Sequence, residues 1–261
     1  MTSSIEQALR FPSVAVLKSG PQDRVPISDA VDIWSCSLEG DAAVLERCRA
    51  SLSEEEHRRA ARFVRPQDQI EFTFAHGGVR LVLARYLDIA PDALRFLIGP
   101  TGKPALLEGH GGPQGLRFNL SHSHGRMLLA VAKGQDIGID LERIRGNLEV
   151  LKLAERFYTQ TEVESIKTRP VSDRALHFYH LWVAKEAFLK AQGAGISSLQ
   201  QCEVVASPFP SRASIRARGY GYSAMPCEWT VQWLGCGPDW QGAVCAYGND
   251  WSVRVLDGMS A

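Results

Sequence analysis

The residues with the clearest chemical potential are two acidic side chains in the segment Gly138–Glu142. Isoleucine and leucine alternate there with Gly138, Asp140 and Glu142, a pattern that predicts a strand. Successive side chains of a strand point to opposite faces, so the two carboxylates share one face, about 7 Å apart. Paired carboxylates suit a hard divalent cation. The solvated face of an edge strand has the same pattern, and the segment alone leaves both interpretations open.

A second group of charged residues lies in the segment Trp182–Lys190. Trp182, Glu186 and Lys190 recur at the i, i+4, i+8 spacing of one helix face, and Lys185 precedes the glutamate. An ordinary surface helix with a Glu–Lys pair has this spacing too. If the helix packs on the acidic strand, three carboxylates and two lysines converge. Such a group suits magnesium and a polyphosphate.

A third polar run, Asn119–His124, contains two serines and two histidines. Ser121 and His122 are adjacent, so on a strand they point apart and cannot form a nucleophile–base pair. His122 and His124 share a face, but the spacing provides no third zinc ligand. The simplest interpretation is a strand end whose serine and histidine donate to an anion. A polar hairpin remains the alternative for His124.

Two basic segments could contact phosphate. Gly99–Pro104 lacks the spacing of a phosphate-binding P-loop and the helix that follows one, so it predicts a turn, with or without Lys103 at a ligand. Arg58, Arg59 and Arg62 lie on a basic helical stretch. Such a stretch is usually a solvated face, and a binding role requires a phosphate partner.

Hydrophobic periodicity predicts an α+β chain to position these residues. The predicted strands are Val31–Leu38, Leu94–Ile98, Leu116–Leu120, Met127–Ala132 and Ile137–Leu141, with further short strands in the tail Cys202–Val255. The predicted helices are Ala42–Arg49, Ser53–Arg62, Gln67–Leu87, Val150–Phe157, Thr161–Lys167 and Asp173–Gln192.

Three features of the first half recur about 106 residues later. They are the strand Val31–Leu38, matched by Ile137–Ile144; the helix cap Ser53–Glu56, matched by Thr159–Glu162; and the helix around Val79-Arg80, matched by Lys185-Glu186. This echo favours two similar halves, residues 31–135 and 136–261, after an irregular segment 1–30. Coincidence between α+β segments is the alternative that the pattern leaves open.

The net charge, the hydropathy and the cysteine content of the chain limit the class of protein. The formal net charge of the 261 residues is zero, so no global field draws the chain to nucleic acid or to an anionic membrane. No apolar stretch approaches the roughly 18 residues of a membrane span, and no secretory signal is visible. Six scattered cysteines predict reduced thiols. We therefore expect a cytoplasmic protein without membrane or nucleic-acid partners.

Together these motifs resemble the signature of the 4′-phosphopantetheinyl transferases, and more narrowly of the Sfp-type members, which are pseudo-dimers of two α+β halves. The resemblance covers about Val31 to Glu203. The main motifs are Asn119-Leu120-Ser121-His122-Ser123, Gly138-Ile139-Asp140-Leu141-Glu142 and Trp182-x-x-Lys185-Glu186-Ala187-Phe188-x-Lys190-x-x-Gly193-x-Gly195-Ile196. Supporting matches are Gly102-Lys103-Pro104 and Phe157-Tyr158-Thr159-x-x-Glu162.

The resemblance implies that a serine of an apo carrier protein attacks the β-phosphate of coenzyme A, so that the phosphopantetheine arm moves and 3′,5′-ADP leaves. Magnesium, with manganese as a substitute, would be the cofactor, and coenzyme A the co-substrate, bound between the halves of a monomer. The partners would be acyl, peptidyl or aryl carrier proteins of fatty-acid, polyketide or nonribosomal-peptide biosynthesis. The sequence does not name the carrier.

The resemblance also implies residue roles. The magnesium ligands would be Asp140, Glu142 and Glu186. The coenzyme A-binding residues would be Arg59, Arg62, Gly102, Lys103, Pro104, Asn119, Ser121, His122, Lys185, Glu186 and Lys190. The catalytic residues would be Glu162, Lys190 and His122, with Glu162 helping to deprotonate the attacking serine, directly or through a metal-bound water.

Some features depart from the family pattern. Glu71 stands where many relatives carry a basic residue, and the loop at His124 is one residue longer than in many of them. Residues 1–30 and Pro208–Cys227 have no clear counterpart. Two rival functions are a non-catalytic relative that binds carrier or coenzyme A, and another magnesium-dependent nucleotide phosphotransferase or hydrolase. The complete set of acidic residues and Lys190 argues against the first rival.

Overall fold

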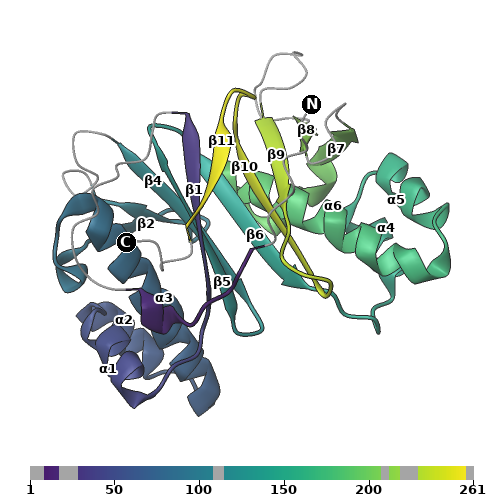
Figure 1. The fold of residues 1–261 in the computed structure, drawn as a ribbon. Helices are drawn as coiled ribbons and strands as arrows, with labels where there is room; N and C mark the ends of the chain where they lie inside the picture. The colour runs from purple at the N-terminus through teal and green to yellow at the C-terminus, as the bar shows by residue number, and fades with distance from the viewer. Residues whose placement is uncertain (1–8, 18–28, 108–114, 207–211, 218–228, 257–261) are drawn as a thin grey trace. The chain divides into compact units, whose positions relative to one another are not determined.

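The computed structural model describes residues 9–17, 29–107, 115–206, 212–217 and 229–256, and they form the predicted α+β fold (Figure 1). The chain divides into two compact units. The N-terminal unit comprises Arg10–Ile98, Pro104–Gly134 and Ser252–Ala261; the C-terminal unit comprises Met1–Leu9, Gly99–Lys103 and Gln135–Trp251. The division into domains 1–30, 31–135 and 136–261 stays a prediction. Much of 1–30 and of the stretch 208–227 lies outside the described residues.

The N-terminal unit contains a four-stranded sheet in the order β11-β1-β5-β4. Its strands are β1 (Ala30–Ser37), β4 (Leu116–Ser123), β5 (Arg126–Lys133) and β11 (Ser252–Leu256). Strand β11 runs parallel to β1, and the other neighbours are antiparallel. A separate pair joins β2 (Phe96–Ile98) to β3 (Pro104–Leu106). The sequence pattern did not predict β3.

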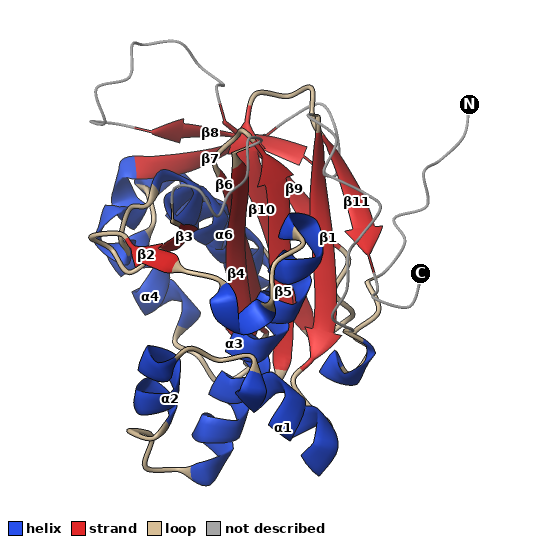
Figure 2. Cartoon of the chain, turned by 90° about the vertical axis from the view of Figure 1, so that its left-hand side faces the viewer, coloured by secondary structure: helices blue, strands red, loops and turns tan. Residues whose placement is uncertain are grey.

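This unit has three helices (Figure 2): α1 (Ala42–Ala50), α2 (Glu54–Ala60) and α3 (Pro66–Leu87). Helices α1 and α2 pack on α3. Two short 3₁₀ turns, Val14–Val16 and Pro91–Ala93, complete the unit. The core lies between α3 and the sheet, where Phe74 and Val82 join Trp34, Phe118 and Leu129 in one buried apolar cluster. Residues 77–84 of α3 are all buried, so this half of the helix is covered on every side, as expected for a helix in the core of a unit.

The C-terminal unit contains a five-stranded antiparallel sheet in the order β6-β10-β9-β8-β7. Its strands are β6 (Ile137–Arg143), β7 (Cys202–Ala206), β8 (Arg212–Ala217), β9 (Trp229–Leu234) and β10 (Trp240–Tyr247). Its helices are α4 (Val150–Phe157), α5 (Gln160–Lys167) and α6 (Val171–Gln192), followed by the 3₁₀ turn Ile196–Gln201. Apolar residues of α6 pack with those of β7 to β10, while α4 and α5 pack on α6.

Both units contain a strand, a short helix with a capping box and a helix of 22 residues. The long helices α3 and α6 each end at a residue in the left-handed conformation, Asp88 and Gly193. The repeat noted in the sequence therefore corresponds to a repeated local arrangement. None of the described helices combines the length and the hydropathy that a membrane span needs.

The structure corrects the alignment of the repeat by one residue. Helix α3 starts at Pro66 and helix α6 at Val171. The number of residues between these two helix starts is one fewer than the number between the two capping boxes. Arg80 thus corresponds to Lys185. The sequence match had paired Arg80 with the following glutamate.

Candidate functional site

Strand β6 meets helix α6 at Gly138. A Cβ atom at this position would lie 2.0 Å from the carbonyl oxygen of Ala187, so the helix backbone approaches the strand where there is no side chain. Asp140 and Glu142 follow on the same strand face, and α6 therefore runs beside both carboxylates. A glycine within a strand pattern is a sequence signal for such close approach.

Asp140 and Lys190 form an ion pair between this strand and this helix. The Lys190 Nζ atom donates to Asp140 Oδ1 at 2.6 Å. The Asp140 side chain is buried, whereas that of Lys190 is 29% exposed. The expected contact between the acidic strand and the basic helix is therefore present, with Lys190 at its solvent side.

Glu186 lies one turn before Lys190 and is almost completely buried, with 9% of its surface exposed. Its pKa is raised from 4.5 to about 7, mainly by burial and also by the nearby Asp140 and Glu142 carboxylates, while Lys190 opposes the rise. Its Oε1 atom is buried and has no hydrogen-bond partner among the described residues. Desolvated carboxylates that repel one another are expected to attract a cation.

The donors at this position fit magnesium in kind. Magnesium prefers oxygen ligands and takes only a few from the protein, and the unpartnered Glu186 oxygen is one that a cation would satisfy. Within the described ranges, however, no group of three or more His, Cys, Asp or Glu side chains has the arrangement of a metal centre. It is therefore the chemistry of the donor atoms, and not a ready-made cluster of ligands, that supports a cation here.

Lys185 does not join the carboxylates beside it on α6. Its side chain is fully buried, and its Nζ atom pairs with Glu162 Oε2 at 2.5 Å. Of the two lysines expected to converge on the acidic residues, only Lys190 does so. A fully buried ammonium has no surface to offer a phosphate, which disfavours the expected phosphate contact of Lys185.

The Gly99–Pro104 segment forms a turn, as predicted, with Gly102 in the left-handed conformation. Lys103 Nζ donates to the carbonyl oxygens of Ile137 at 3.1 Å and Ala191 at 3.0 Å. Lys103 thus links the start of β6 to the last turn of α6, where a positive charge is favourable. Pro104 is the first residue of β3 in the N-terminal unit.

The polar run of β4 divides between the two faces of that strand. Asn119 and Ser121 are buried on one face, whereas His122 is exposed on the other. The structure confirms that the adjacent serine and histidine point apart. His124 has a left-handed backbone, and its Nδ1 atom lies 3.0 Å from Ser123 Oγ in the turn before β5. The hairpin interpretation of His124 is therefore the one that the structure supports.

The two arginines expected at a phosphate lie on the surface of the N-terminal unit. Arg59 is an exposed residue of α2, with its guanidinium 5.3 Å from the centre of the Phe72 ring. Arg62 is exposed just after that helix. Glu71 is near the start of α3, where it accepts a hydrogen bond from Gln67 at 3.2 Å.

Comparison with known proteins places these residues in context. Residues 136–246 match the family model described as the 4′-phosphopantetheinyl transferase superfamily. The 4′-phosphopantetheinyl transferase HetI of Nostoc sp. is 36% identical over 188 residues, which cover 72% of this chain and 79% of HetI. The 4′-phosphopantetheinyl transferase Sfp of Bacillus subtilis is 32% identical over 155 residues, which cover 58% of this chain and 65% of Sfp.

Proposed function

Because this chain belongs to the 4′-phosphopantetheinyl transferase superfamily, we propose that it moves the phosphopantetheine arm of coenzyme A to a serine of an apo carrier protein. The serine hydroxyl oxygen forms a bond to the β-phosphorus and its proton is released to water, while the bond from that phosphorus to the bridging oxygen breaks and 3′,5′-ADP leaves with that oxygen. The acceptors in this proposal are acyl, peptidyl or aryl carrier proteins. The names of the relatives HetI and Sfp support the activity.

The observation that carries the proposal is the contact between β6 and α6. It brings the buried carboxylates of Asp140 and Glu186 beside the partly exposed Lys190, within the segment that matches the family model. Transfer between phosphate esters requires mainly positioning and charge neutralisation. A site with cation-binding oxygens and one ammonium group can meet both demands.

In this proposal, magnesium is held by Asp140, Glu142 and Glu186, and manganese can replace it. A magnesium ion at the pyrophosphate would stabilise the charge that develops on the leaving ADP. Lys190 exchanges its contact with Asp140 for a phosphate oxygen and acts there as a point charge. The raised pKa and the unpartnered oxygen of Glu186 support the cation.

The remaining coenzyme A contacts are proposed from the matched motifs. They comprise Arg59, Arg62, Gly102, Lys103, Pro104, Asn119, Ser121 and His122. The exposure of the two arginines and of His122 is compatible with an anionic ligand. We also propose a cytoplasmic location. The five cysteines within the described residues are buried free thiols, as expected in a reducing compartment.

The test is incubation of the protein with coenzyme A, magnesium and an apo carrier, followed by intact-mass measurement of the carrier. We expect the mass of the phosphopantetheine arm to be added. No mass gain with acyl, peptidyl and aryl carriers would contradict the proposal. Breakdown of coenzyme A without a carrier would instead indicate a nucleotide hydrolase.

A further inference from the structure

Glu162 is held by hydrogen bonds on both carboxylate oxygens. Its Oε2 atom accepts from the Thr159 backbone N–H at 3.0 Å, from the Thr159 hydroxyl at 3.3 Å and from Lys185 Nζ. Its Oε1 atom accepts from the Val204 N–H at 3.0 Å. Only 3% of the side chain is exposed. A general base needs an oxygen within reach of the substrate hydroxyl, and this carboxylate has its acceptor sites turned inward.

Lys185 depends on Glu162 for its neutralisation. Its ammonium is fully buried, with the centre of the Tyr158 ring 4.7 Å away and the Cys202 thiol also near it. The Tyr158 hydroxyl donates to the Phe178 carbonyl oxygen, and burial raises the pKa of this phenol well above its usual value. Glu162 is therefore the anion that balances Lys185, and removing either charge leaves the other buried alone.

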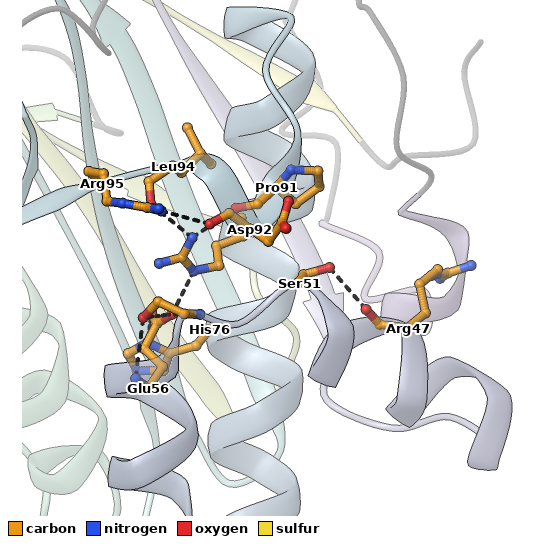
Figure 3. A network of polar contacts seen from close by, with 10 residues as sticks. Arg47, Ser51, Glu56, His76, Pro91, Asp92, Leu94 and Arg95 are labelled. Carbon is orange, nitrogen blue, oxygen red and sulfur yellow. Dashed lines mark hydrogen bonds and ion pairs between the residues drawn. The ribbon is translucent and has the colours of Figure 1, made fainter.

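The N-terminal unit contains a similar pair of a capping-box glutamate and a buried cation, Glu56 and Arg80. Glu56 accepts from the Ser53 N–H and hydroxyl and from Arg80 Nε at 2.6 Å, and its second oxygen lies 3.2 Å from His76 Nδ1. Arg80 also donates to the carbonyl oxygens of Pro91 and Leu94. Figure 3 labels Glu56, His76, Pro91 and Leu94 among the residues of this network.

The strand beside the Glu56–Arg80 pair has no counterpart of the two carboxylates Asp140 and Glu142. The strand positions that match Asp140 and Glu142 are occupied there by Trp34 and Cys36, both buried in the apolar core. A glutamate–cation pair that recurs in a unit without these carboxylates serves the fold of each unit. Its presence in the C-terminal unit therefore does not by itself indicate proton transfer.

We propose that Glu162 is a positioning residue of the transferase and not its general base. By neutralising Lys185 it fixes the turn of α6 that carries the next residue, Glu186, against strand β6. Glu162 then takes no proton during the reaction. This inference rests on the proposed function, because it assigns a role within phosphopantetheine transfer.

The test compares the single variants Glu162→Gln and Lys185→Met with the double variant. Each single variant leaves one uncompensated buried group, so we expect lower thermal stability and at least a tenfold lower kcat. The double variant removes both charges, and we expect its melting temperature to recover and its kcat to rise to within about tenfold of the wild type. A folded double variant that stays as inactive as Glu162→Gln would overturn the inference.

If the double variant does not fold, the pH dependence of kcat in Glu162→Gln decides. Glutamine cannot accept a proton, so loss of a general base at this position would abolish the acid limb of the profile. Loss of a positioning residue leaves that limb in place and lowers only the plateau. A profile of Glu162→Gln without the acid limb of the wild type would overturn the inference.

The pair in the N-terminal unit provides the matched control. Glu56→Gln is expected to lower stability, as Glu162→Gln does, while kcat of the folded protein stays near that of the wild type. If Glu56→Gln lowered kcat as much as Glu162→Gln does, the effect of Glu162→Gln could not be assigned to its local action on α6. The wild type is measured alongside the variants. If the wild type transfers no phosphopantetheine, the proposed function and this inference are both rejected. If the wild type is active but a folded double variant is not, only the inference is rejected.

Discussion

Each unit sets a long helix against a strand, but through different side chains. In the N-terminal unit, Asp32 of β1 accepts a hydrogen bond from Tyr86 of α3 at 2.7 Å and is paired with Arg254 of β11 at 2.6 Å. The guanidinium of Arg85 lies 5.3 Å from the centre of the Trp34 ring. The buried charge in this contact is fully compensated.

In the C-terminal unit, the matching positions hold smaller and more acidic residues. Gly138 and Ala191 replace the aspartate and the tyrosine, and Asp140 with Lys190 replaces the tryptophan and the arginine. Glu186 occupies the position of an apolar residue of α3 and keeps a buried oxygen without a partner among the described residues. A buried unsatisfied group destabilises a fold and requires an explanation, which the proposed cation would provide.

The largest expected effect comes from removing that carboxylate. Glu186→Ala is expected to lower the rate of carrier modification by about a thousandfold, or about 4 kcal/mol, because it removes a ligand of the proposed metal site. The matching variant in the N-terminal unit, Leu81→Ala, should lower stability and leave kcat of the folded protein unchanged. Intact-mass rates and thermal unfolding check both. Undiminished transfer by Glu186→Ala would contradict the assignment of the metal ligand.

The next effect is on stability. Gly138→Ala forces a methyl group onto the backbone of α6, and we expect the free energy of unfolding to fall by about 3 kcal/mol. Gly146→Ala is the control, because no atom lies within 4 Å of a Cβ at that position. Urea unfolding of both variants tests the close approach. Equal stabilities would mean that the strand and the helix are not in contact at Gly138.

Lys190→Ala tests whether the lysine at the contact between β6 and α6 binds coenzyme A. We expect the KM for coenzyme A to rise about tenfold, or about 1.4 kcal/mol, while the KM for the carrier changes little. Arg85→Ala removes the matching cation of the N-terminal unit and should leave both constants near those of the wild type. Steady-state kinetics with each substrate varied in turn provides the measurement. An unchanged KM for coenzyme A in Lys190→Ala would argue against a phosphate contact.

The smallest effect is confined to acid pH. Burial raises the pKa of Glu56, but hydrogen bonds from His76 and the Ser53 N–H and the charge of Arg80 outweigh it and lower the pKa from 4.5 to about 2. The folded state thus holds the ionised form more strongly than the unfolded state does. The resulting stability is present above pH 4.5 and is lost as the pH falls toward 2.

Glu56→Gln should therefore flatten the acid side of the stability profile in a series of urea titrations. The matched variant Glu54→Gln changes an exposed glutamate of the same helix turn and should keep the slope of the wild type. An equal slope in wild type and Glu56→Gln would contradict the ion pair with Arg80.

Local pattern was sufficient for most elements of the fold. The predicted bounds of α4 are those of the structure, and α1, α3 and β1 agree within a residue or so, because apolar periodicity is a property of neighbouring residues. The pairing of β11 was not predictable in this way. Arg254 reaches Asp32 of the N-terminal unit from the far end of the chain, and no local pattern encodes such a partner.

The sequence by itself determined which residues share a face: Asp140 with Glu142 on a strand, and Glu186 with Lys190 on a helix. It also contained the capping box of Thr159 and Glu162, the signal of a structural glutamate. Only the tertiary structure decided that Lys190 meets the carboxylates while Lys185 turns to Glu162. Periodicity fixes the direction of a side chain around its own helix, whereas burial and ion pairing depend on the elements that pack against it.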